Sequence, residues 1–287
     1  METRSSDFPV PNRVILATDF SPASSAAEWV ACRVAQGLNA PVTILHIFQY
    51  VPHHRYKVPV EWMVEIIRRD VRGKLKEAKG MFREANVEAE VMVIEDGAPS
   101  QQIVNFVRSF ESPVLVMGTH ATGGMERFLI GSTAEEVLRL AGCPVITVGP
   151  HVTSAMKSDP RLSKLLYATD FSEASLGAVP LVAALKQSLG ADLQVLHIST
   201  ESSFEAKDED PQFDRIRKSF GDQGSAEFVT LHGKDICQAI VNEAERYPAD
   251  LLILGVHRAS AFAAHLAPKI AFQTIAAAPC AVLTISS

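Results

Sequence analysis

Apolar runs that end in polar turns alternate, along the whole chain, with longer segments whose apolar residues have helical spacing. In the first half, the runs predict strands at 13–18, 42–48, 88–94, 113–118 and 144–148, the first of them buried on both faces. The segments between them predict helices at 22–38, 61–86, 99–110 and 132–141. Strands that alternate with helices indicate parallel pairing and right-handed crossovers.

Two short motifs recur in the second half. ATDFS at 17–21 is repeated 151 residues later at 168–172, and LHI at 45–47 is repeated at 196–198. The chain is therefore two copies of one module. We expect an α/β protein with two tandem Rossmann-like, doubly wound domains, each a five-stranded parallel sheet flanked by helices. The domains are expected at 1–150 and 164–287, with a linker at 151–163.

Composition excludes several classes of partner. With a net charge of −6 over 287 residues, the chain has no basic stripe for nucleic acid or an anionic membrane. No segment reaches the length of an apolar membrane span, and the first residues lack the apolar core of a secretory signal, so we expect a cytoplasmic protein. The four cysteines, Cys32, Cys143, Cys237 and Cys280, have no metal-ligand spacing and are expected to be free, buried thiols.

A candidate site follows from the strand ends of the first half. Ligands of doubly wound sheets bind at the carboxyl ends of the strands, where the strand order reverses. Ala17, Thr18 and Asp19 end one strand, and Met117 and Gly118 end another. The sequence Gly131-Ser132-Thr133 then starts a helix, where free N–H groups, two hydroxyls and the positive end of the helix dipole favour an anion. These residues predict a phosphate-sized anion site beside an apolar slot.

The motifs VILATDFS, LHI, VMGTH and GSTAEEVLRLAGCPVITV resemble those of the universal stress protein family, over nearly the whole chain. Nucleotide-binding members carry Gly-x2-Gly-x9-Gly-[Ser/Thr] after the fourth strand, which aligns with Gly118, Ala121, Gly131 and Ser132. The resemblance implies that the first half binds ATP, with or without Mg²⁺. Asp19 and Ile47 would border the adenosine, and Gly118, Gly131, Ser132 and Thr133 would meet the phosphates. The complete implied site is Ala17, Thr18, Asp19, Ile47, Met117, Gly118, Ala121, Gly131, Ser132 and Thr133.

The second half lacks the predicted phosphate cradle. The positions of Ala121 and of Gly131-Ser132-Thr133 hold Arg258 and Pro268-Lys269-Ile270, so one N–H donor and both hydroxyls are lost. We expect a degenerate site there; a site for a different anion is the alternative. Asp19 and the pairs His46/His197 and His120/His257 occur in both halves, which favours a structural role for them. The part present in one half only, Gly131-Ser132-Thr133, has the strongest functional claim.

The sequence is compatible with three functions. The first is adenine-nucleotide sensing with a regulatory role in stress, the second half serving as its pairing partner. The second is a scaffold that binds no nucleotide because Ala121 replaces glycine, and the third is a slow ATPase, although no catalytic base is evident. The last strands, 144–148 and 280–285, are expected to pair the two halves as subunits pair in a dimer. Two further expectations are a homodimer of the whole chain and contacts with partner proteins that the sequence does not identify. His53-His54 is predicted to be a loop rather than a metal site.

Overall fold

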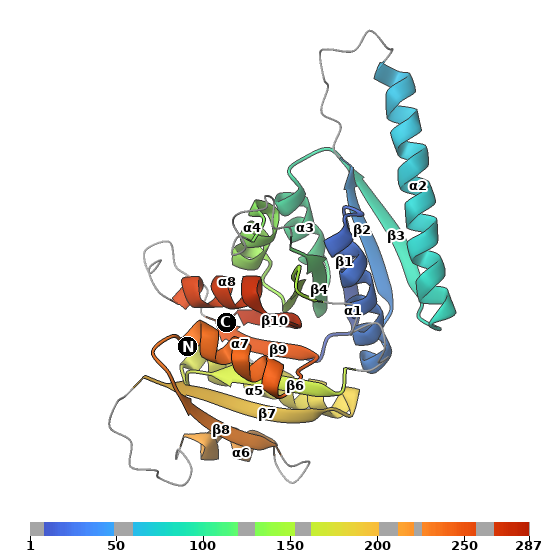
Figure 1. The fold of residues 1–287 in the computed structure, drawn as a ribbon. Coiled ribbons are helices and arrows are strands. Elements are labelled where there is room, and N and C mark those ends of the chain that lie inside the picture. The colour runs from blue at the N-terminus through green and yellow to red at the C-terminus, as the bar shows by residue number, and fades with distance from the viewer. Residues whose placement is uncertain are drawn as a thin grey trace, which may run out of the picture.

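The computed structural model describes residues 9–48, 60–119, 130–152, 162–200, 212–220, 226–256 and 267–286. The two halves form one ten-stranded sheet with helices on both faces (Figure 1). The elements of the first half are β1 (Arg13–Ala17), α1 (Pro22–Leu38), β2 (Val42–Phe48), α2 (Val60–Glu84), β3 (Ala89–Glu95), α3 (Pro99–Val107), β4 (Pro113–Gly118), α4 (Ser132–Leu140) and β5 (Val145–Val148). Those of the second are β6 (Lys164–Thr169), α5 (Glu173–Leu189), β7 (Asp192–Ser199), α6 (Phe213–Phe220), β8 (Glu227–His232), α7 (Ile236–Arg246), β9 (Leu251–Val256), α8 (Ala267–Ala277) and β10 (Ala281–Ser286).

The strand order confirms the doubly wound α/β prediction. It runs β3-β2-β1-β4-β5-β10-β9-β6-β7-β8, and each half contributes five parallel strands. The two last strands join the halves: β5 and β10 pair antiparallel, with Ile146 opposite Leu283. The expected pairing through these strands is therefore confirmed, and it merges two sheets into one.

The helices divide between two hydrophobic layers in the same way in both halves. α1, α2, α5 and α6 pack on one face of the sheet, and α3, α4, α7 and α8 pack on the other. Inner strands such as β1 and β4 read as continuous apolar runs because both of their faces are covered. None of the helices in the described part of the chain is long and apolar enough to cross a membrane.

The first helix of each half begins at a serine N-cap and ends at a residue in the left-handed conformation. The Ser21 side chain accepts a hydrogen bond from the Ser24 N–H at the start of α1, with Pro22 at the first helical position. The Ser172 side chain accepts the matching hydrogen bond from the Ser175 N–H at the start of α5. Left-handed residues, Asn39 with φ 49° and Gly190 with φ 60°, follow the two helices. The sequence prediction of this helix is confirmed at both ends.

The thiols agree with the sequence prediction in all but one case. None of the four cysteines is in a disulfide bond; Cys32, Cys143 and Cys280 are buried, whereas Cys237 is only half-buried. Burial raises the pKa of the Cys280 thiol to about 12. This thiol is therefore protonated and unreactive at neutral pH.

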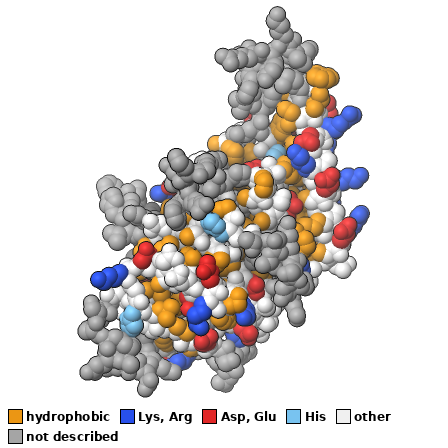
Figure 2. Space-filling model, in the orientation of Figure 1, with side chains coloured by type: hydrophobic (Ala, Val, Ile, Leu, Met, Phe, Trp, Pro, Cys, Tyr) orange, Lys and Arg blue, Asp and Glu red, His pale blue; other side chains and the backbone are white. Residues whose placement is uncertain are grey.

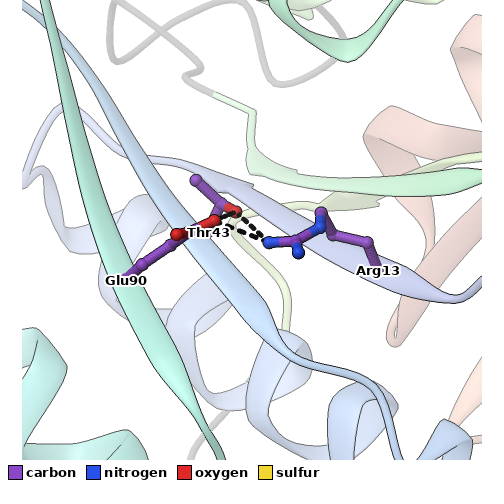
Figure 3. Close-up of polar contacts among 3 residues, drawn as sticks. All are labelled: Arg13, Thr43 and Glu90. Carbon is purple, nitrogen blue, oxygen red and sulfur yellow. Dashed lines mark hydrogen bonds and ion pairs between the residues drawn. The ribbon is translucent and has the colours of Figure 1, made fainter. Parts of the chain in front are cut away.

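A row of polar side chains crosses β1, β2 and β3 near the amino-terminal ends of these strands (Figure 3). The Arg13 guanidinium donates to Thr43 Oγ1 at 3.0 Å and to Glu90 Oε1 at 2.6 Å, and Thr43 Oγ1 donates to the same carboxylate. In the second half, Gln194 and Glu227 occupy the corresponding positions and are also hydrogen-bonded. Because this row lies at the end of the strands opposite the predicted site, it serves the fold.

The long helix of the first half is less buried than its pattern predicted. Leu75 and Phe82 are buried, but Trp62 is 61% exposed and Ile66 is 48% exposed. The predicted amphipathic helix is present, but Trp62 and Ile66 in its amino-terminal part do not face the core. The cause is length: 25 residues of helix span about 37 Å, whereas the seven residues of β3 span about 23 Å.

The carboxyl of Glu28 on α1 is expected to make stability depend on pH. Burial raises its pKa from 4.5 to about 7, and it makes no hydrogen bond or ion pair with the described residues. The folded chain therefore binds a proton more tightly than the unfolded chain, so stability should rise as the pH falls from 7 towards 4.5. Urea unfolding should show Glu28→Gln to be more stable than the parent at pH 8, with the difference vanishing near pH 4.5. A constant difference across this range would contradict the assignment.

Candidate nucleotide site in the first half

The reversal of strand order lies between β1 and β4. The chain leaves β1 towards β2 on one side and later returns to β4 on the other. The register places Ala17 beside Met117 at the carboxyl ends of these strands. Both side chains are buried in one hydrophobic cluster with Ala134 of α4, and Ile47 packs against that cluster. The structure thus brings Ala17, Ile47 and Met117 onto the same face of the sheet as α4.

Asp19 belongs to a tightly bonded turn between β1 and α1. Its Oδ1 accepts hydrogen bonds from the Ser21 N–H at 3.0 Å and from the Ser24 hydroxyl at 2.6 Å. Thr18 Oγ1 accepts from the N–H of Phe20, which holds the left-handed conformation with φ 61°. A bulky residue in this conformation is unfavourable, so the hydrogen bonds on either side of Phe20 are needed to hold it.

The second half contains a matching turn, although its sequence lacks the residues of the predicted phosphate cradle. Asp170 Oδ1 accepts from the Ser172 N–H at 3.0 Å, and Phe171 has φ 58°. Burial opposes ionisation of Asp170, but hydrogen bonds from Ser172 and Ser175 outweigh it and lower the pKa of this carboxyl below 3.8. A turn whose backbone conformation and aspartate–serine N–H bond recur in both halves is a feature of the fold. Sequence comparison missed the bracing role of Ser24, although its recurrence as Ser175 could have revealed it.

The strand-end histidines are also structural. His46 Nδ1 donates to the Thr18 carbonyl at 2.8 Å, and its ring lies 4.7 Å from that of Phe20. His197 makes the matching contacts with Thr169 and Phe171. The prediction of hydrogen-bonded histidines is confirmed for this pair, whereas His120 and His257 lie outside the described residues. No group of metal-ligating side chains occurs in the described part of the chain.

Gly118 has a packing reason to be glycine. A Cβ on Gly118 would lie 2.7 Å from the Ala23 carbonyl carbon and 2.8 Å from the Ser24 nitrogen, both in the backbone of α1. Gly255 is in the same situation, since its Cβ would lie 2.5 Å from the Cα of Ser175. The first glycine of the motif is therefore required for close packing of helix on strand in both halves, whatever binds nearby.

The start of α4 differs from the starts of the other well-defined helices. Gly131 occupies the N-cap position with φ −60° and ψ 148°, and no side chain caps the helix. Side chains do cap α1, α5 and α7; α3 also has no side-chain cap, but it begins with a proline, which has no N–H to be capped. Ser132 is exposed and Thr133 half-buried. Within the described ranges, no side chain caps the first N–H groups of α4, which suits solvent or a ligand at this position. Ala121 lies outside the described residues, as do Arg258 and the side chains of Pro268 and Lys269 in the second half.

Comparison with known proteins settles the family. The model of the universal stress protein family matches residues 11–149 and 162–286. The chain belongs to the universal stress protein family. A universal stress protein of Methanocaldococcus jannaschii is 30% identical over 138 residues, which are 47% of this chain and 81% of the relative. The protein YxiE of Bacillus subtilis is 27% identical over 154 residues, covering 48% of this chain and 98% of the relative.

The tandem architecture also has counterparts of known structure. A universal stress protein from Archaeoglobus fulgidus superposes with a TM-score of 0.73 at 18% identity, covering 98% of both chains. One from Pseudomonas aeruginosa superposes with a TM-score of 0.64 at 13% identity, covering 96% of this chain and 93% of the other. This universal stress protein therefore shares its fold, over nearly its whole length, with both of these solved structures.

Proposed function

We propose that the first half of this universal stress protein binds one adenine nucleotide, with its phosphates at the start of α4. The proposal is carried by the uncapped helix start Gly131-Ser132-Thr133, which follows the strand that forms one side of the switch point. Backbone N–H groups, two hydroxyls and the helix dipole together suit a phosphate group. The second half, whose matching helix α8 contains Pro268 in its first turn, serves as the pairing partner.

The residues of the proposed site are expected to have different roles, according to their positions. Ala17, Ile47 and Met117 supply apolar surface at the strand ends, suited to the adenine face. Asp19 lies at the same edge, and its Oδ1 already braces the turn into α1; we therefore expect it to contribute less to binding than the start of α4. Gly118 contributes by letting α1 approach closely rather than by contacting phosphate. In this proposal nucleotide occupancy regulates contacts with other proteins.

The proposal is tested by thermal unfolding of the full chain with ATP, ADP, AMP and adenosine. At a ligand concentration 100 times its Kd, binding should stabilise the chain by about 2.7 kcal/mol. The nucleotides should stabilise in the order ATP and ADP above AMP, with adenosine weakest, because the phosphates meet α4. No shift with any of them would favour the scaffold function, and equal shifts with ATP and adenosine would contradict phosphate binding at α4.

A further inference from the structure

The two edge strands of the sheet are covered unequally. β8 has half-buried side chains at its four central positions, because Phe213 of α6 packs on Phe228 with their rings 5.1 Å apart. β3 instead leaves three consecutive apolar side chains exposed: Val91 at 37%, Met92 at 41% and Val93 at 38%. The half with the longer helix therefore has the more exposed edge.

The backbone of β3 also offers hydrogen-bonding groups at this edge. The Glu88 carbonyl accepts from Val42, and the Asp96 N–H donates to Phe48, so these residues face β2. Because alternate residues of a strand direct their backbone groups to opposite sides, Ala89, Val91, Val93 and Glu95 point theirs outward. Among the described strands, none pairs with this side of β3. Such an edge is a template for an added strand.

The amino-terminal part of α2 extends the apolar surface beyond the end of β3. The Arg68 guanidinium contacts the Glu95 carboxylate at 2.8 Å, which fixes where the helix passes the end of the strand. Trp62, Ile66 and Ile67, 40–61% exposed, lie in the turns that precede Arg68. This amino-terminal part of α2 projects past the sheet (Figure 1). In Figure 2, hydrophobic side chains gather at this end of α2, and charged ones follow its outer side.

Charge indicates what kind of strand fits. The apolar run of β3 is flanked by Glu88 and Glu90 on one side and by Glu95 and Asp96 on the other, all exposed. Arg13 and Arg68 pair with two of these acids, which leaves a net charge of −2 at the edge. Antiparallel pairing with β3 of a second copy would bring acids opposite acids, which is unfavourable. A strand with basic flanks would be attracted.

We propose that β3 accepts an extended segment of a partner protein, with an apolar centre of about four residues between lysines or arginines. The segment pairs with the outward backbone groups of Val91 and Val93, and its basic flanks meet the acids at both ends of β3. Trp62 and Ile66 then cover the part of the segment that runs past Glu95. This surface is separate from the proposed nucleotide site and does not depend on it.

The chain has two tryptophans, Trp29 and Trp62. The test uses the full chain with Trp29→Phe, so that all tryptophan fluorescence comes from Trp62. The probe is a synthetic peptide, Lys-Lys-Val-Thr-Val-Ile-Lys-Lys, blocked at both ends. Binding should shift the Trp62 emission to shorter wavelength and slow hydrogen exchange at the N–H groups of Val91 and Val93 by at least about tenfold. Peptides with glutamate in place of lysine, or with N-methylated backbone on one edge, should bind at least about tenfold more weakly.

A matched pair of variants separates this edge from the other. Val93→Lys on β3 should reduce peptide affinity about tenfold or more, whereas Thr230→Lys, at the corresponding position of β8, should leave it unchanged. The two control peptides on the parent chain keep the test decisive if either variant fails to fold. Unchanged exchange at Val91 and Val93 in saturating peptide would overturn the proposal. Sedimentation that shows a dimer lost in Val93→Lys would also overturn it, because the occupant would then be a second copy.

Discussion

Gly118→Ala is expected to lower the free energy of unfolding by about 3 kcal/mol, at the upper end of the cost of overpacking. The new methyl group would lie within 2.9 Å of backbone atoms of Ala23 and Ser24, and backbone cannot move aside as a flexible side chain can. Helix α1 would have to shift away from β4 as a unit. Urea unfolding monitored by circular dichroism measures the effect.

Glycines in open positions provide the control for this substitution. Gly80 lies in α2 with nothing within 4 Å of a Cβ, so Gly80→Ala should stabilise the chain by about 0.5–1 kcal/mol. Gly255→Ala should cost about as much as Gly118→Ala, although the second half lacks the phosphate cradle. If Gly118→Ala were well tolerated and abolished only ligand binding, its proposed packing role would be refuted.

Gly131→Asp is expected to separate stability from binding. Aspartate is a good N-cap residue, so it should keep the free energy of unfolding unchanged or raise it by a few tenths of a kcal/mol. The same carboxylate would occupy the N–H groups of α4 and repel a phosphate, which should weaken ATP binding about 100-fold, or roughly 3 kcal/mol. Urea unfolding without ligand and the thermal shift with ATP measure the two effects separately. A loss of stability that matched the loss of binding would mean that Gly131 serves the fold.

Comparing the two repeats predicted much of the fold. The ATDFS turn and the capped first helix could be inferred because each depends on short-range chemistry within a repeated motif. The structural histidines were predicted for the same reason. The pairing of the last strands was implied by the family resemblance instead. What the repeats share is held by hydrogen bonds within one turn, such as those of Asp19 with Ser21 and Ser24.

Other features depend on contacts that no local pattern specifies. Helical spacing in α2 shows which side of the helix is apolar, but only the length of β3 determines where that side leaves the sheet. The glycine of a phosphate motif and the glycine of a close helix contact look alike in sequence, so the role of Gly118 needed the neighbouring backbone of α1. The row of Arg13, Thr43 and Glu90 joins residues up to 77 positions apart.

Isothermal titration of ATP into the parent chain and into Gly131→Asp tests the central proposal most directly, because it gives stoichiometry and affinity together. We expect one ATP per parent chain and about 100-fold weaker binding to the variant. Two equivalent sites per chain would contradict a degenerate second half, and equal affinity of the two proteins would contradict phosphate binding at the start of α4.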